Sequence, residues 1–214
     1  MANIKRITKL TLFDMIKFPE IYAGLADGLI ELPLPDKFRI RKLLTIPLTR
    51  EQLADNICYA QRLYLAREEI NDFGLIIRIV GGYFYPQISG LKFNEENICK
   101  ILKYIITCLA KDIYPVALHL VKLIGELIIN EQKLLYKEPT KLELAAGIEK
   151  LNAFSELNTL DFLSNSMRCT TDEVMLTPYN ECLVRLMNAK ELNEYQERYF
   201  KLQIEESNFK NKKR

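Results

Sequence analysis

The side chains best suited to nucleophilic or metal chemistry in this sequence are a single histidine and five cysteines. A cysteine nucleophile needs a nearby base, and the only imidazole, His119, lies in a crowded apolar stretch. A zinc site would use cysteines in close pairs such as C-x-x-C, and no such pair occurs here. The cysteines are Cys58, Cys99, Cys108, Cys169 and Cys182. We therefore interpret His119 as a core residue with satisfied ring nitrogens, and we expect no metal, no cofactor and a reducing compartment.

Carboxylates could perform general acid–base catalysis if two of them faced the same substrate. The acidic pairs in this chain are adjacent in sequence, and adjacent residues of a helix point in different directions. These pairs are Glu68/Glu69, Glu95/Glu96 and Glu205/Glu206. Gly81 and Gly82 lack the G-x-G-x-x-G spacing of a nucleotide-binding loop. We identify no catalytic residues, and we expect a protein that is not an enzyme and has no small-molecule substrate.

The longest apolar pattern runs from Asn94 to Gln132, with a proline inside it. Apolar residues recur at helical spacing on both sides of Pro115. They are Ile98, Ile101, Leu102, Ile105, Ile106 and Leu109, then Leu120, Val121, Leu123, Ile124, Leu127 and Ile128. Because proline disfavours a helical residue before it, we expect two long helices that meet at a kink or break between Asp112 and Pro115. The second is apolar around most of its circumference, which predicts that this pair is the centre of a bundle.

Other helices are marked by capping boxes, in which the side chains at the first and fourth positions accept hydrogen bonds from free backbone N–H groups. Three occur, at Thr49–Gln52, Thr140–Glu143 and Thr170–Glu173. The first predicts a helix that continues through Leu65, and the second predicts a helix with a buried stripe formed by Leu144, Ile148 and Leu151. Further helices are expected over 72–80, 156–167 and 178–202. The predicted fold class is all-α, a helical bundle around the long central helix pair.

The chain divides by pattern into an extended, proline-punctuated N-terminal arm over 1–48, a helical domain over 49–206 and a basic tail over 207–214. The arm contains an apolar, proline-rich stretch from Leu29 to Pro35 that carries too many leucines for a solvated linker. We expect it to lie along either the protein's own core or a neighbouring subunit. Leu29, Leu32 and Leu34 are therefore candidate interface residues, and we expect a chain without residues 1–48 to stay folded.

Three consecutive aromatic residues, Tyr83, Phe84 and Tyr85, follow the glycine pair and precede Pro86. This arrangement predicts a helix end at Gly81–Pro86. The aromatic side chains have two interpretations. They could fill the core at that helix end, or they could form an aromatic anchor patch at a protein interface, where tyrosine and phenylalanine are enriched.

The 214 residues suffice for one large domain or two small ones, and 49% hydrophobic residues can form a core. The formal net charge is only +2, too even for the strong field of a nucleic-acid-binding or membrane-surface protein. Charged residues within the central pattern argue against a membrane span. We see no secretory signal at the N-terminus, so we expect a protein that stays in the cytoplasm where it is made.

Two blocks resemble small helical proteins encoded among the structural genes of tailed bacteriophages, of the crAss-like and related Bacteroidales-infecting type. The first block includes LTREQL (48–53), YAQ (59–61), IIRIV (76–80) and YFYP (83–86). The second includes AGIE (146–149), FSELNTLD (154–161), EVML (173–176), PYNEC (178–182) and EYQERY (194–199). Together they cover about half of the chain. The resemblance implies a head-to-tail connector ring protein or a tail-assembly factor. It does not assign a functional role to any individual residue.

Three functional hypotheses follow. The first is a non-enzymatic virion structural protein, one subunit of a homo-oligomeric head-to-tail connector or tail ring that contacts the portal and neighbouring ring or tail subunits. The second is a tail-assembly chaperone that is absent from the mature particle, and the third is an unrecognised enzyme. The first places the protein in the virion after synthesis in the host cytoplasm, without membrane or nucleic-acid partners.

Overall fold

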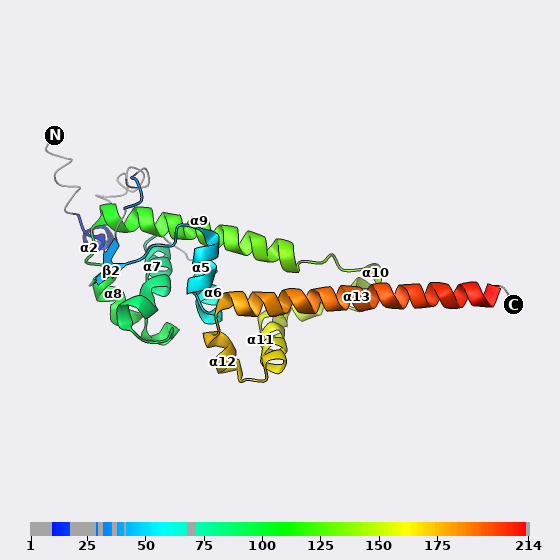
Figure 1. Cartoon of the computed structure of the whole chain (residues 1–214). Coiled ribbons are helices and arrows are strands. Elements are labelled where there is room, and N and C mark those ends of the chain that lie inside the picture. The colour runs from blue at the N-terminus through cyan, green and yellow to red at the C-terminus, as the bar shows by residue number, and fades with distance from the viewer. Residues whose placement is uncertain are drawn as a thin grey trace. The chain divides into compact units, whose positions relative to one another are not determined.

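The computed structural model describes residues 10–17, 29, 32–35, 38–40, 42–67 and 72–212. The described part of the chain is all-α apart from one small hairpin, as predicted. In chain order the elements are α2 (Leu12–Lys17), β1 (Phe38–Ile40), β2 (Lys42–Leu44), α5 (Arg50–Asn56), α6 (Tyr59–Leu65), α7 (Asp72–Ser89), α8 (Cys99–Ile105), α9 (Ala110–Leu135), α10 (Lys141–Ala145), α11 (Ser155–Met167), α12 (Thr171–Leu176) and α13 (Tyr179–Lys212), with 3₁₀ turns at Glu95–Asn97 and Ile148–Phe154 (Figure 1).

The chain forms two compact units that differ from the predicted arm, domain and tail. Unit 1 comprises Met1–Ile129 and Met175–Tyr179, and unit 2 comprises Asn130–Val174 and Asn180–Arg214. The described residues of the predicted arm belong to unit 1, and α13 continues to Lys212, past the expected start of the tail at Ser207. Nearly all of the buried hydrophobic side chains among the described residues lie in unit 1.

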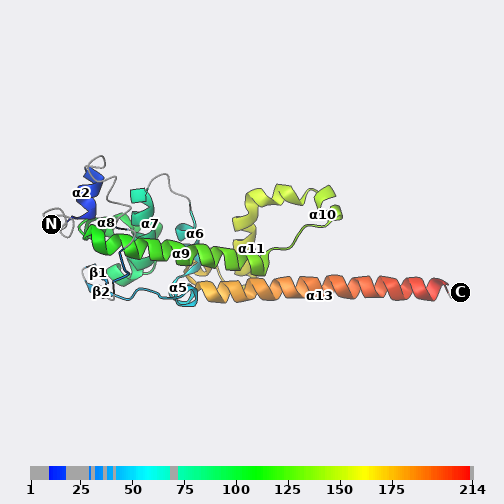
Figure 2. The ribbon, with the colours of Figure 1, turned by 90° about the horizontal axis from the view of Figure 1, so that it is seen from above.

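The predicted central pair over 94–132 forms α8 and α9, which both bury side chains in unit 1, and α7 is central there as well. Every side chain position from Ile79 to Tyr85 is buried, and α7 contacts α6, α8 and β2 (Figure 1). Helix α8 has only seven residues. Helix α9 lies along one side of α7 and α8 (Figures 1 and 2), and its outer face exposes Leu118 and Ile129. Apolar residues around most of the circumference of α9 led us to predict that it is buried on all sides. Because large apolar residues are also common on protein surfaces, that prediction overestimated its burial.

The predicted helix end at Gly81–Pro86 is wrong, because α7 continues through Pro86 to Ser89 and stops at Gly90, which has φ +72°. The glycine pair instead permits close helix packing. A Cβ atom on Gly82 would lie 2.7 Å from the Tyr64 ring on α6, and one on Gly81 would lie 3.2 Å from Ile105 Cδ1 on α8. The two glycines therefore allow the neighbouring helices to approach α7.

The buried side chain of Gln61 explains how α7 accommodates its proline. Pro86 has no backbone N–H, so the carbonyl four residues earlier, that of Gly82, lacks its helical donor. Gln61 Nε2 donates to this carbonyl at 2.9 Å and lies 3.3 Å from the carbonyl oxygen of Tyr83. Its Oε1 atom accepts from the backbone N–H of Cys58 at the start of α6. One buried amide thus completes the hydrogen bonding of two helices.

We expect the substitution Gln61→Leu to destabilise unit 1 by about 2–4 kcal/mol, because it leaves the buried Gly82 carbonyl and the partly buried Cys58 N–H without these partners. The adjacent substitution Pro86→Ala restores a helical donor for Gly82. In a urea-denaturation double-mutant cycle, Gln61→Leu should therefore cost at least about 1 kcal/mol less in the Pro86→Ala background. Additive effects of the two substitutions would contradict this hydrogen-bond assignment.

The break between the two central helices lies at Ile106–Leu109, upstream of the predicted site, and Pro115 sits inside α9. The reason is a pairing with the N-terminal segment. The N–H groups of Leu12 and Phe13 donate to the carbonyls of Cys108 and Ile106, and Ala110 donates to Leu10. These backbone groups are used by a distant segment, so they do not continue the helix.

A similar pairing divides the helix predicted from Thr49 through Leu65 into α5 and α6. Tyr59 N–H donates to the Thr177 carbonyl, and Tyr179 N–H donates to the Ile57 carbonyl, both at 3.0 Å. This short bridge connects the α5–α6 junction to the chain just before α13. The prediction that the last helix begins after Pro178 is confirmed.

All three predicted threonine caps are confirmed. The hydroxyl oxygens of Thr49, Thr140 and Thr170 each accept a hydrogen bond from the backbone N–H three residues later. The reciprocal bond forms at Thr140 and Thr170, whereas the Gln52 side chain accepts from Leu48. The stripe predicted after Thr140 is wrong, because α10 ends at Ala145 and the side chains of Leu144 and Leu151 are exposed.

The predicted arm contributes to the core of unit 1 instead of lying extended over its surface. β1 and β2 pair antiparallel, with Phe38 opposite Leu44. Alternation along the hairpin buries Phe38, Ile40 and Leu44 and exposes Arg39 and Leu43. Earlier in the arm, α2 buries Leu12 and Met15.

Candidate protein-interaction surfaces

The predicted interface aromatics are core residues of unit 1. Tyr83, Phe84 and Tyr85 are all at most 2% exposed. The Phe84 ring lies 5.4 Å from that of Phe38 and 4.8 Å from that of Tyr83, and burial raises the pKa of the Tyr83 hydroxyl to about 12. Their burial agrees with the first interpretation, that these aromatic residues fill the core. They do not form an aromatic anchor patch on the surface of this fold. The sequence could not decide between them because both use the same residue types.

The predicted interface leucines of the arm are placed differently from one another. Leu29 is 2% exposed and therefore faces the protein's own core. Leu32 is exposed and Leu34 is half-buried, so these two remain available to a partner. The arm thus provides a smaller external surface than its composition suggested.

The structure defines the surroundings of three of the groups considered for chemistry, His119, Cys58 and Cys108. His119 Nε2 lies 2.8 Å from the Pro47 carbonyl oxygen, and since a carbonyl only accepts, this nitrogen carries the hydrogen. Burial raises the pKa of the Cys58 thiol, and burial together with the Asp112 carboxylate raises that of Cys108 to about 11. Both thiols are protonated at neutral pH. No cluster of three or more potential metal ligands occurs among the described residues.

A pocket of about 260 Å³ opens at the junction of α5, α6 and the chain before α13. Its titratable lining groups are Asp55, Cys58 and Lys92, and apolar groups include Phe93 and Leu176. The raised pKa of Cys58 works against nucleophilic chemistry there. The pocket has the dimensions to receive a side chain of a partner or a small molecule at the lower end of the usual size range.

Unit 2 differs from unit 1 in having very little core. Among its described hydrophobic residues only Leu163, Val174 and Cys182 are buried. Many large apolar side chains are exposed instead. They are Tyr136, Leu142, Leu144, Leu151, Phe154, Leu157, Phe162, Val184, Leu192, Tyr195, Tyr199, Phe200, Leu202, Ile204 and Phe209. Exposed apolar surface of this kind is typical of interaction sites on proteins.

The C-terminal half of α13 carries the most continuous part of this surface. Every described side chain from Tyr195 to Phe209 is exposed. In Figures 1 and 2 the C-terminal end of α13 lies beside no other described element of unit 2. Local ion pairs such as Arg198–Glu194 at 3.6 Å support the helix, but pairs of this kind contribute only about 0.2–0.5 kcal/mol each. Most helical stability in proteins comes from packing, so this half of α13 would gain much from a partner.

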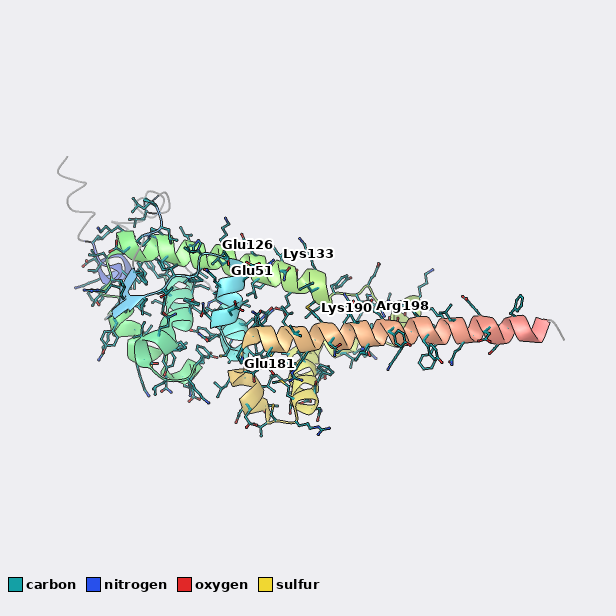
Figure 3. All side chains as sticks on the ribbon, viewed as in Figure 1. Glu51, Glu126, Lys133, Glu181, Lys190 and Arg198 are labelled. Carbon is teal, nitrogen blue, oxygen red and sulfur yellow. The ribbon has the colours of Figure 1, made fainter. Side chains whose placement is uncertain are left out.

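The first part of α13 is anchored by one of its faces within unit 2. Lys190 Nζ donates to the carbonyl oxygens of Leu134 and Tyr136 at the C-terminal end of α9, at 2.8 and 3.2 Å. A cation at this helix end also interacts favourably with the helix dipole. Lys137 pairs with Glu197, whose carboxylate raises the pKa of the lysine. Figure 3 marks Lys190 and Arg198 along this helix.

No helix in the described part of the chain combines the length and apolarity needed to cross a bilayer. Comparisons with protein-family models, with curated proteins and with solved structures found no match to this chain.

Proposed function

We propose that the protein acts through protein–protein contacts and that unit 2 provides its main contact surface. The observation that carries this proposal is the contrast between the units: unit 1 buries most of its described apolar side chains, whereas unit 2 exposes most of them along α10, α11 and α13. Burying such surface against a partner is worth about 25 cal/mol per Å² before the costs of association. The capped helix starts at Thr140 and Thr170 stabilise the first turns of α10 and α12.

Within this class, we propose the more specific role of a virion structural protein, a subunit of a head-to-tail connector or tail ring in a tailed bacteriophage. The support for this role is the resemblance of the 48–86 and 146–199 blocks to phage structural-gene products. Its partners would be the portal, neighbouring ring or tail subunits and further copies of itself. A ring built from heterologous contacts needs surfaces on two sides of each subunit, and an exposed apolar surface on unit 2 could be one of them.

The exposed surface of unit 2 also fits a second candidate, a tail-assembly chaperone that binds another phage protein and then leaves. A chaperone needs the same kind of apolar contact surface, so exposure alone favours both. The two differ in their fate, because a structural subunit remains in the finished particle.

Quantitative mass spectrometry of purified phage particles distinguishes these candidates. We expect the intact chain to be present at a fixed ratio to the major capsid protein through successive density-gradient and size-exclusion steps. A ratio that falls towards zero with purification, while capsid protein is retained, would favour the chaperone and contradict the structural role.

A further inference from the structure

The exposed apolar residues of α13 follow a seven-residue pattern. Leu192, Tyr195, Tyr199, Leu202 and Phe209 are separated by three, four, three and seven residues, with Glu206 at the remaining position of the pattern. This is the a/d spacing of a coiled coil, with a at 192, 199 and 206 and d at 195, 202 and 209. We call these six positions the 192–209 seam. The equivalent positions one heptad earlier, Arg185 and Asn188, are polar, so the seam begins at Leu192.

The contacts inside unit 2 leave this seam on the outer side of α13. Lys190 and Glu197, which bind the 134–137 segment, both occupy heptad position f. Position f lies on the face of the helix opposite a and d. The anchored face and the seam therefore point in opposite directions. Tyr195 and Tyr199 stack along the seam with ring centroids 6.2 Å apart, which gives it a flat aromatic surface.

The single charged seam residue, Glu206, decides between the two possible orientations of a helix pair. In a parallel pair of identical helices, Glu206 would face Glu206 of the second copy, and like charges repel in this position. In an antiparallel pair centred between Tyr199 and Leu202, it faces Tyr195, whose hydroxyl can donate to the carboxylate. The other layers then pair Tyr199 with Leu202 and Leu192 with Phe209.

The charges that flank the seam agree with the antiparallel orientation. In that arrangement position g of one helix faces position g of the other. Arg198 then faces Glu205, and this pair occurs twice by symmetry. The e positions place Gln196 opposite Gln203, which is neutral. In a parallel pair Arg198 would instead face the neutral Gln203.

We propose that a second copy of this chain docks on the 192–209 seam of α13 to form an antiparallel two-helix coiled coil. The proposal deepens the contact function proposed above and rests on it. The contact is isologous and stops at two copies, so it adds to the heterologous contacts of a ring without replacing them. A seam of 18 residues is only about 27 Å long, and it lies at the lower end of stable interface sizes. We therefore expect a dissociation constant on the order of 10–100 µM.

Sedimentation velocity of the full-length protein, from about 5 to about 300 µM, tests the association. The wild type should shift from monomer to dimer with concentration, and Leu202→Glu should weaken association at least tenfold by placing a carboxylate in a central layer. The matched control is Ile204→Glu, which changes a residue of similar exposure, 61% against 64%, on the anchored face. Circular dichroism should show unchanged helix content for both. Equal association of the two variants, or a monomeric wild type at every concentration, would overturn the proposal.

Disulfide trapping under mild oxidation tests the orientation, with cross-linked peptides identified by mass spectrometry. The double variant Leu192→Cys/Phe209→Cys should give an intermolecular 192–209 link. Leu192→Cys alone should give no 192–192 link, because antiparallel ends lie far apart, and such a link would overturn the antiparallel assignment. A monomeric protein that is nevertheless present in purified particles would refute only the coiled coil. A dimer that is absent from particles would refute only the virion role.

Discussion

The substitution Ile105→Asp is expected to unfold unit 1. The Ile105 side chain is 0% exposed in α8 and contacts the position of Gly81, so its replacement puts a carboxylate in a tightly packed helix interface. An unpaired buried charge costs several kcal/mol, against a typical net stability of about 5–15 kcal/mol. Circular dichroism and thermal denaturation should show the loss of the cooperative transition. Ile105→Ala should be milder, at about 2–5 kcal/mol.

Helix α9 provides a matched comparison for the same effect. Ile124 is 7% exposed and Ile129 is 53% exposed on the same helix. Ile124→Asp should also abolish the thermal transition, whereas Ile129→Asp should move the midpoint by only a few degrees. If Ile105→Asp and Ile124→Asp kept midpoints close to that of the wild type, the described core of unit 1 would be wrong.

Deletion of residues 1–48 should prevent folding of unit 1, contrary to the expectation from the sequence that the remainder would stay folded. Among its described residues, the deleted segment supplies the buried hydrophobic side chains of Leu10, Leu12, Met15, Leu29, Phe38, Ile40, Leu44 and Ile46. Each fully buried aliphatic or aromatic side chain contributes about 1.5–3 kcal/mol, so their sum exceeds a typical net stability. The deletion also removes the backbone partners of the α8–α9 junction. The variant should be aggregated or protease-sensitive.

A deletion at the other end serves as the control. Residues 207–212 belong to the exposed end of α13 and include no buried side chain among those described. Removal of 207–214 should leave the thermal transition of unit 1 unchanged. A cooperative transition of wild-type height in the 1–48 deletion would show that the N-terminal residues are dispensable for the core.

The parts of this fold that were predictable from sequence are those fixed by local chemistry. A threonine followed three residues later by Gln or Glu satisfies backbone groups within one turn, and all three such sites cap helices. Pro178 also marks the start of α13. The all-α class follows from helical spacing of apolar residues, which the hairpin at 38–44 interrupts only briefly.

The parts that were not predictable depend on segments distant in sequence. The helix breaks at Ile57–Cys58 and Ile106–Leu109 occur where backbone groups pair with 177–179 and 10–13. No local residue type signals these breaks, whereas Pro115, which does carry a local signal, lies within a helix. The flexible glycines at 81 and 82 suggested a helix end. Their actual role, close packing against Tyr64, cannot be recognised in a single sequence.

The candidate contact surface was only partly accessible to sequence reasoning. Leucines in the arm and three aromatics in α7 have the composition of interface residues, yet Leu29 and Tyr83–Tyr85 are buried. The helix over 178–202 was predicted, and its seven-residue spacing was present in the sequence. The spacing alone did not show whether these side chains are exposed. A stripe such as Tyr195, Tyr199 and Leu202 also occurs on the inner face of a core helix.

The most direct test of the account is hydroxyl-radical footprinting of the tyrosines in the free protein and in purified particles, read by mass spectrometry. Tyr195 and Tyr199 are exposed, whereas Tyr83 and Tyr85 are buried and serve as internal controls. We predict that Tyr195 and Tyr199 are readily oxidised in the dilute free protein and at least fivefold less in particles. Tyr83 and Tyr85 should be protected in both. Equal oxidation of Tyr195 and Tyr199 in the two samples, or absence of the chain from particles, would contradict a contact function for unit 2 in the virion.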